Sequence, residues 1–209
     1  MPKRYKKRMN KTAEKSICVF GASSSRIGRV YLDAAFETGR LIASASFGLV
    51  FGAGDSGVMG AAARGAESAG GRIVGVIPEK LNRKGIYFEG CTERIETATM
   101  HERKSLMEEL SSGFIALAGG YGTMEEFMEV LTLKQLKYFD KPVVLLNTNG
   151  YFDHLIRQLE RCVEEGFTSE AHSALYHVAA DPIDAVNYCK DYKGMDIKDK
   201  LPGMEGGQR

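Results

Sequence analysis

The 209-residue sequence contains no long apolar run and almost no excess charge of either sign. A membrane span needs about 18 or more consecutive apolar residues and a signal peptide needs an apolar core, so we expect neither in this chain. The formal net charge of +1 gives no bulk electrostatic attraction to nucleic acid or to a membrane surface. Neither is therefore expected as a partner.

Cysteine is scarce as well. The four cysteines form no CxxC pair and lie in apolar segments: Cys18, Cys91, Cys162 and Cys189. We interpret them as reduced core residues of a cytoplasmic protein. The four histidines lack the spacing of metal ligands, so structural or surface roles are expected for them and no metal site is predicted.

Short β-type runs alternate along the chain with longer segments of helical period. Strands are expected at residues 16–21, 48–52, 72–78, 92–96, 113–118, 142–147 and 175–179. Helices are expected at residues 27–45, 57–69, 100–111, 123–139, 151–165 and 181–190. The apolar strands alternate poorly, as is typical when both faces of a parallel sheet are covered. The pattern predicts a doubly wound, Rossmann-like α/β fold with about seven parallel strands and helices on both faces.

The length fits one domain, which we place at residues 16–192 and expect to bind a nucleotide. Residues 1–15 are basic and are expected to form a disordered tail, with a nucleic-acid-binding arm as the alternative. Residues 193–209 also have the composition of a disordered tail.

Three predicted strands end in turns of small residues: "GASSSRIG" (21–28), "GAGDSGVMG" (52–60) and "AGGYGT" (118–123). In a parallel sheet all three turns lie at the carboxyl edge and can meet at one ligand. Small residues let backbone N–H groups approach phosphate oxygens, and a following helix adds a favourable dipole. The three turns together favour a nucleotide phosphate.

The second turn also matches GxGxxG, the dinucleotide fingerprint. Its position after the second strand is unusual, and the acidic residue expected about 20 positions later would have to be Glu79, which follows a proline. A nicotinamide cofactor is thus a minor alternative. Another alternative is that the glycines are required only for tight turns.

The segment "TATMHERKSLMEEL" (97–110) has the pattern of an amphipathic helix. Its apolar stripe, which includes Met107, extends back to Arg103, and Thr99 with Glu102 fits a capping box at the helix start. An inward guanidinium is costly unless it is paired or binds an anion. Arg103 is therefore a candidate site residue, with a structural ion pair or an arginine reaching solvent as the alternatives.

Two acids, Glu125 and Glu126, follow the third glycine-rich turn. Thr123 and Glu126 fit a capping box, in which the carboxylate merely satisfies the helix start. The helical period also places Glu126 on the apolar face, beside a turn shaped for an anion, where a carboxylate needs a nearby cation. Arg103 is that candidate cation. A phosphate held by the turn and a carboxylate near its sugar suggest cleavage of an N-glycosidic bond, because the transition state carries positive charge on the sugar.

At these residues the sequence resembles a known family. The pair "MHERK" (100–104) and "AGGYGTMEE" (118–126) is similar to the MHxRK and PGGxGTxxE motifs of the Lonely Guy (LOG) proteins. Those are cytokinin riboside 5′-monophosphate phosphoribohydrolases, long labelled possible lysine decarboxylases. The resemblance covers about residues 16–190. It implies hydrolysis of a purine riboside 5′-monophosphate, with or without an N6-prenyl group, to free base and ribose 5-phosphate.

The resemblance also implies residue roles. Arg103 and Glu126 match the residues held to be catalytic in the family. The substrate-binding set expected here comprises Arg103, Lys104, Gly119, Gly120, Tyr121, Gly122, Thr123, Met124, Glu125 and Thr132, with Ser23 and Gly54 from the first two turns. A homodimer with its site near the subunit interface is implied, with no metal and no organic cofactor.

Several positions depart from the family pattern. The proline of the motif is Ala118, a tryptophan expected in the long helix is Leu133, and Gly85 aligns where many members carry a substrate-contacting glutamate. Unmodified AMP, which would make the activity like that of an AMP nucleosidase, is therefore as plausible a substrate as a prenylated nucleotide. A non-catalytic nucleotide or molybdenum-cofactor carrier is the alternative function. Lysine decarboxylation is not supported, because no lysine of the sequence is accompanied by the partner groups that a pyridoxal-phosphate site requires.

Overall fold

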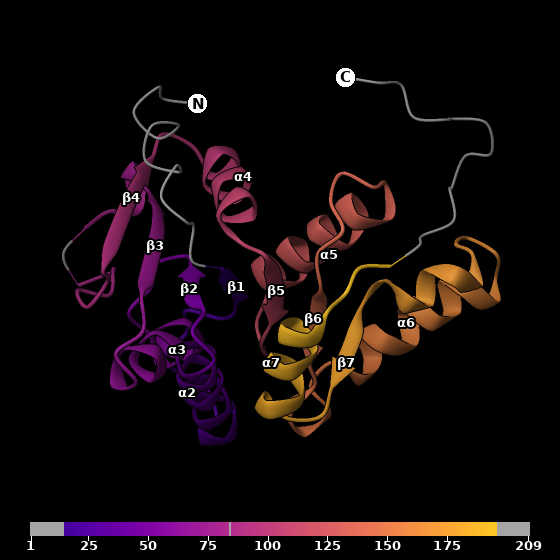
Figure 1. Cartoon of the computed structure of the whole chain (residues 1–209), viewed down its shortest axis with the longest axis horizontal. Coiled ribbons are helices and arrows are strands. Elements are labelled where there is room, and N and C mark those ends of the chain that lie inside the picture. The colour runs from indigo at the N-terminus through magenta and orange to yellow at the C-terminus, as the bar shows by residue number, and fades with distance from the viewer. Residues whose placement is uncertain (1–14, 84, 196–209) are drawn as a thin grey trace.

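The structure is a computed structural model that describes residues 15–83 and 85–195 (Figure 1). The tails predicted from composition therefore lie almost wholly outside the described residues. Of the predicted C-terminal tail, residues 193–195 are described, and the Met195 N–H donates to Asp140 Oδ2 at 2.8 Å.

The strands form one parallel sheet in the order β4-β3-β2-β1-β5-β6-β7. Their bounds are β1 Ser16–Phe20, β2 Gly48–Phe51, β3 Ile73–Pro78, β4 Glu93–Thr97, β5 Gly113–Ala116, β6 Val143–Leu146 and β7 His177–Ala179. The chain runs outward from β1 in one direction and returns to continue from β1 in the other. This is the doubly wound topology predicted from the sequence, and its switch point lies between β1 and β5.

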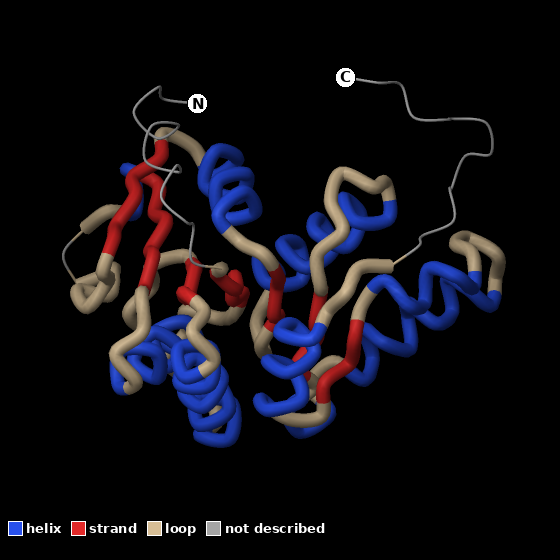
Figure 2. The backbone as a smooth tube through the Cα atoms, viewed as in Figure 1, coloured by secondary structure: helices blue, strands red, loops and turns tan. Residues whose placement is uncertain are grey.

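Helices cover both faces of the sheet (Figures 1 and 2). One face is covered by α2 (Arg29–Ser44), α3 (Gly57–Ser68) and α7 (Pro182–Asp191), the other by α4 (Met100–Leu110), α5 (Tyr121–Gln135) and α6 (Asp153–Glu164). Short 3₁₀ turns lie at η1 (Glu79–Leu81), η2 (Thr148–Gly150) and η3 (Glu170–Leu175).

The two faces carry separate cores, which explains the poor alternation of the strands. In β1, Ile17 and Val19 pack under α2 and α3, whereas Cys18 and Phe20 pack under α4 and α5. A strand buried on both faces gains from apolar residues at every position. The predicted seventh strand is shorter than expected, because residues 170–175 form η3 instead.

The three glycine-rich turns meet as predicted, because they follow the adjacent strands β2, β1 and β5. The Ala22 N–H donates to the carbonyl of Ala118 at 3.4 Å, and the Met59 N–H donates to the carbonyl of Ala22 at 3.2 Å. The first turn thus joins the other two at the carboxyl edge.

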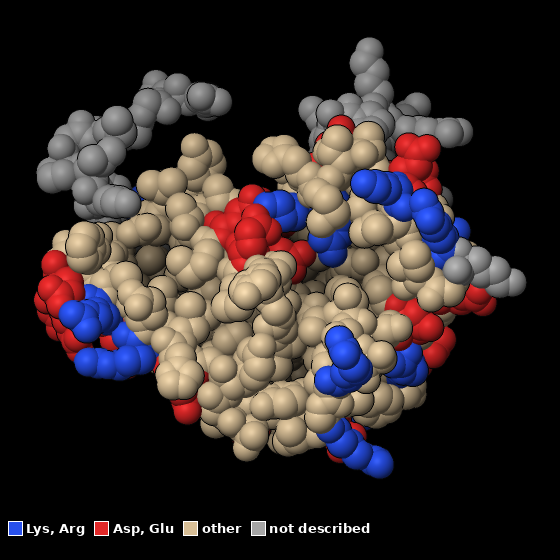
Figure 3. All heavy atoms as spheres, turned by 180° about the vertical axis from the view of Figure 1, so that it is seen from behind, with Lys and Arg blue, Asp and Glu red and all other residues tan. Residues whose placement is uncertain are grey.

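The cysteine prediction is confirmed in part. All four are free; Cys18 and Cys189 are buried, while Cys91 and Cys162 are only partly buried. None of the described helices combines the length and apolar character needed to cross a membrane. Among the described residues on the face shown in Figure 3, acidic and basic side chains lie beside one another in small groups rather than in one broad basic surface.

Lys134, near the end of α5, is fully buried, and its Nζ has no hydrogen-bond partner among the described residues. Its Nζ lies 4.6 Å from the centroid of the Tyr192 ring. Burial lowers the pKa of Lys134 from its ordinary 10.5 to about 8, against the attraction of Asp140. The charged form is therefore disfavoured by folding.

Replacing this lysine by an isosteric apolar residue is expected to stabilise the protein. Below pH 8 Lys134 is charged in both states, so its burial penalty is fully present. We expect Lys134→Met to raise the free energy of unfolding at pH 7 by about 1–3 kcal/mol, measured by urea denaturation. The advantage should fade as pH rises from about 8 to 10.5, where the folded protein loses the proton first.

The exposed Lys80→Met is the control and should change stability by less than about 0.5 kcal/mol. A less stable Lys134→Met protein would show instead that the contacts with Tyr192 and Asp140 outweigh the cost of burial.

Candidate active site

The start of α4 fixes where Arg103 points. Thr99 is the N-cap, and its Oγ1 accepts a hydrogen bond from the Glu102 N–H at 3.1 Å. Glu102 Oε2 in turn accepts from the Ala98 N–H at 2.9 Å. This confirms the predicted capping box. With the helix start held in this way, Arg103 faces inward and is 7% exposed.

Arg103 connects β3 to α5. Its Nε donates to the carbonyl of Val76 at 3.2 Å, and its Nη1 lies 3.0 Å from Glu126 Oε1. The two side chains of this ion pair are 9% and 12% exposed. The predicted pairing of the buried arginine with Glu126 is confirmed.

Gly52, directly after β2, makes room for the guanidinium. A Cβ at this position would lie 1.9 Å from Arg103 Nη2 and 3.0 Å from its Cζ. The second glycine-rich turn therefore serves the Arg103–Glu126 pair directly, which the sequence did not indicate.

The ionisation of Glu126 is set by two opposing effects. Burial raises the pKa of its carboxyl group, and the charge and hydrogen bond of Arg103 lower it; the net result is a pKa above the ordinary 4.5. The arginine thus offsets part of the penalty that burial places on the charged carboxylate. Such a group can stabilise a cation or accept a proton from water.

The glycines of the third turn lead directly into α5. Gly120 is the N-cap, and no side chain caps the helix. The alternative interpretation of Thr123 and Glu126 as a capping box is wrong, because α5 begins at Tyr121 and Thr123 is its third residue. The side chain of Thr123 lies over Gly119 instead, 2.0 Å from where a Cβ would be.

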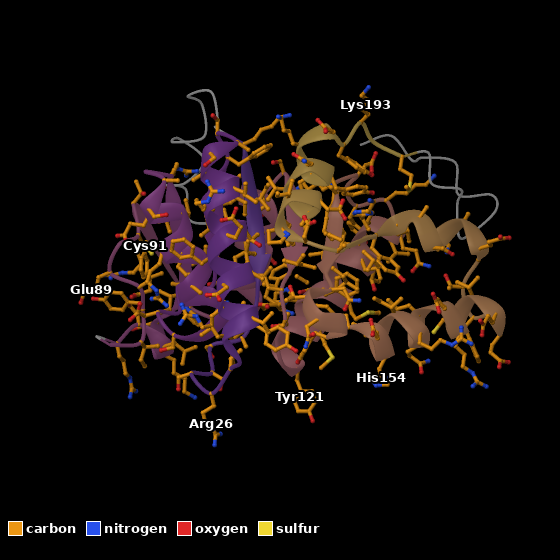
Figure 4. The ribbon with its side chains drawn as sticks, turned by 90° about the horizontal axis from the view of Figure 1, so that it is seen from below. Arg26, Glu89, Cys91, Tyr121, His154 and Lys193 are labelled. Carbon is orange, nitrogen blue, oxygen red and sulfur yellow. The ribbon has the colours of Figure 1, made fainter. Side chains whose placement is uncertain are left out.

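An α-helix leaves its first N–H groups without an intrahelical acceptor. With no side-chain cap at Gly120, the N–H groups at the start of α5 are available to an anion, and the helix dipole favours one. Tyr121 is 91% exposed, and in Figure 4 it projects from the same edge of the molecule as Arg26.

Lys104 joins α4 to α5 beside the pair. Its Nζ forms ion pairs with Glu125 and, at 2.8 Å, with Glu129. Although partial burial opposes it, these carboxylates raise the pKa of Lys104. The acids near the start of α5 are therefore matched by cations from α4.

The remaining predicted site residues lie in two places, near the carboxyl edge of the sheet and further along α5. Ser23 is exposed in the turn after β1, and Gly54 forms a bridge with Tyr87, both at the carboxyl edge. Met124 is partly buried in the first turns of α5. Thr132 lies apart from Glu126: it lines a cavity of about 230 Å³ between α5 and α6, and its hydroxyl donates to the carbonyl of Met128 at 2.7 Å.

A second cavity, of about 320 Å³, lies between the turns after β1 and β5. Ser24, Arg26, Gly119, Gly120 and Tyr151 are among the residues that line it. The Tyr151 hydroxyl donates to the carbonyl of Gly119 at 2.7 Å, a contact between distant segments that no sequence pattern predicted. Within the described residues, no group of three or more His, Cys, Asp or Glu side chains is placed to hold a metal ion.

Fold and site together define a Rossmann-like α/β protein with a buried acid–base pair beside a glycine-rich helix start. The profile of a family described as "Possible lysine decarboxylase" matches residues 59–189. A rice (Oryza sativa) protein named probable cytokinin riboside 5′-monophosphate phosphoribohydrolase LOGL9 is 41% identical over 176 residues, which are 84% of this chain and 78% of the relative. Arabidopsis thaliana LOG1, named cytokinin riboside 5′-monophosphate phosphoribohydrolase, is 41% identical over 178 residues, 85% of this chain and 84% of the relative. The chain belongs to this family, the LOG family.

Solved structures share the fold. The molybdenum cofactor carrier protein of Chlamydomonas reinhardtii is 29% identical, with a TM-score of 0.65 over 85% of this chain and 96% of that one. The molybdenum cofactor binding protein of Rippkaea orientalis is 23% identical, with a TM-score of 0.68 over 86% of this chain and 98% of that one. The similarity to the Rippkaea orientalis protein shows a shared fold and nothing more.

Gly52→Ala should disturb the ion pair, because the guanidinium must shift from its present position to avoid the new Cβ. We expect a loss of about 1–3 kcal/mol in the free energy of unfolding, measured with urea. The pKa of Glu126, followed by NMR titration, should rise further as Arg103 moves away.

Gly122→Ala is the matched control, since a Cβ at position 122 meets no atom within 4 Å. It should be neutral or stabilising by up to about 1 kcal/mol, as expected for alanine in a helix. An intact ion pair in Gly52→Ala, with unchanged stability, would contradict this account of Gly52.

Proposed function

We propose that this protein hydrolyses the N-glycosidic bond of a purine riboside 5′-monophosphate, releasing free base and ribose 5-phosphate. The observation that carries the proposal is the buried Arg103–Glu126 pair beside the uncapped, glycine-rich start of α5. Relatives named cytokinin riboside 5′-monophosphate phosphoribohydrolases support the same reaction.

In this reaction water adds to the anomeric carbon as the carbon–nitrogen bond breaks, and the bonding electrons leave with the base, which takes up a proton. Positive charge develops on the sugar in the transition state. The start of α5 binds the 5′-phosphate, and the carboxylate of Glu126 stabilises the sugar cation or activates the water. Arg103 holds that carboxylate ionised and in place.

The base that is released depends on the rest of the site. Gly85, aligned with the family glutamate, has a φ of +86°, and a Cβ there would meet no atom within 4 Å. No acid from this position reaches the substrate, and a glutamate would be strained there. AMP and its N6-prenylated derivative are therefore both proposed substrates, the second giving the product a role in cytokinin biosynthesis.

A nucleotide or molybdenum-cofactor carrier is the second candidate, favoured by the likeness to the Chlamydomonas carrier protein. It is the weaker one, because holding a phosphate needs no buried carboxylate. Binding without turnover would distinguish it.

The protein is further proposed to act as a cytoplasmic homodimer. Met128 and Thr132 on α5 and Leu136 at its C-cap follow one another at intervals of four residues, and all three are exposed. A second copy packed on this stripe would bury the two apolar side chains and would bring Thr132 to the interface. The four free cysteines support the location.

The reaction is tested by chromatography of the free base released from AMP, N6-isopentenyl-AMP, GMP and CMP. We expect Glu126→Gln to lower kcat/KM about a thousandfold and Arg103→Ala at least about a hundredfold. Glu109→Gln, an exposed acid on α4, is the control and should retain activity. Tight AMP binding with no base released by the wild type would favour the carrier function.

The pH dependence provides a separate test. Since Glu126 acts as a carboxylate, kcat/KM should fall on the acid side as the group is protonated. The midpoint of that fall should lie above 4.5, because burial raises the pKa of Glu126. A midpoint at or below 4.5 would argue against Glu126 as the group that titrates.

A further inference from the structure

The chain makes an unusual turn between β6 and α6. Asn149 and Gly150 both have positive φ, 54° and 68°. The Asn147 side chain stabilises the turn: its Oδ1 accepts from the Phe152 N–H at 2.7 Å, and its Nδ2 donates to Asp153 Oδ1 at 2.7 Å. Asn and Gly are the residues that most readily adopt this left-handed conformation, and here they turn the chain sharply before α6.

The turn delivers Tyr151 to the glycine-rich turn before α5. The hydroxyl of Tyr151 donates to the carbonyl of Gly119 at 2.7 Å. The ring is positioned edge-on against Tyr31, with centroids 5.5 Å apart, and against Phe152, at 5.0 Å. Tyr151 is 42% exposed, so these two edge contacts and the hydrogen bond to Gly119, rather than full burial, orient its hydroxyl.

The bonded carbonyl belongs to the peptide between Gly119 and Gly120. No cis peptide bond occurs among the described residues, so the C=O and N–H of this unit point in opposite directions. With its carbonyl held by Tyr151, the unit directs the Gly120 N–H away from Tyr151. A peptide flanked by glycines rotates at low cost, because neither side carries a Cβ that restricts φ and ψ.

Rotation of this peptide would reverse its effect on an anion. It would exchange a donor at the N-cap of α5 for a carbonyl oxygen, which repels negative charge. Glycine is nevertheless required at position 119, since Thr123 fills the space of a Cβ there. The site thus needs a flexible residue and a separate restraint on it.

We propose that Tyr151 is a positioning residue that locks the Gly119–Gly120 peptide in the orientation that binds the 5′-phosphate. The identity of the anion rests on the proposed function; the lock on the peptide does not. Tyr151 touches Gly119 and acts on the substrate only through it.

Tyr151→Phe tests the lock, because it removes the hydroxyl and keeps the ring packed on Tyr31 and Phe152. For AMP hydrolysis we expect KM to rise about tenfold, with kcat changed less than about threefold, because the lost interaction is ground-state phosphate binding. Tyr138→Phe, an exposed tyrosine outside the site, is the matched control and should behave as wild type. A merely structural role would lower the melting temperature without this separation of KM from kcat.

A measurement independent of turnover separates this proposal from the proposed function. Inorganic phosphate is titrated into ¹⁵N-glycine-labelled protein, and the amide signal of Gly120 is followed. The lock predicts binding about tenfold weaker in Tyr151→Phe than in wild type or Tyr138→Phe. If no nucleotide is hydrolysed but this difference in phosphate affinity appears, the proposed reaction is wrong and the proposed role of Tyr151 is supported. Equal phosphate affinity, or equal KM in an active enzyme, overturns the lock.

Discussion

The ion pair between Arg103 and Glu126 is the interaction on which the rest of the site depends. Removing two charges from water is costly, and the cost is offset only when both groups are well placed and fully bonded. Here the capping box turns Arg103 inward, the Val76 carbonyl takes its Nε–H, and Gly52 leaves space for its guanidinium. Residues from β3, α4, α5 and the turn after β2 thus take part in this one contact. An apolar pair would fill the same volume more cheaply, so its presence points to chemistry.

A carboxylate close to an anion site would ordinarily weaken it, and the structure resolves this conflict by pairing. Glu126 is neutralised by Arg103, and Glu125 and Glu129 share Lys104. The uncapped start of α5 therefore carries no local excess of negative charge, as the proposed binding of a phosphate there requires. In the proposed reaction the same carboxylate serves a sugar that turns cationic, so one helix start serves two charges of opposite sign.

Most of the fold was predictable because alternation of strands and helices is a local signal that repeats along the whole chain. The inward position of Arg103 was predictable for the same reason, since the helical period places it on the apolar stripe. The capping box at Thr123 failed because two glycines precede it and allow α5 to begin at Tyr121. The roles of Gly52 and Tyr151 were not predictable, because each depends on contact with a residue distant in sequence. Local patterns indicate which residues face inward, and only the tertiary structure shows what they meet.

Helix α5 has several separate tasks along its length, and this explains how its surroundings are arranged. Its first turn has no side-chain cap, its second carries Glu126, its exposed side includes Met128 and Thr132, and its end buries Lys134. A helix that positions an acid against a phosphate tolerates little axial movement, because a shift of about 1 Å can cost a hundredfold in rate. Ion pairs from α4 hold its first half, and the Tyr151 hydroxyl holds the turn before it. The contacts around α5 thus restrain the part of the helix that the proposed reaction uses.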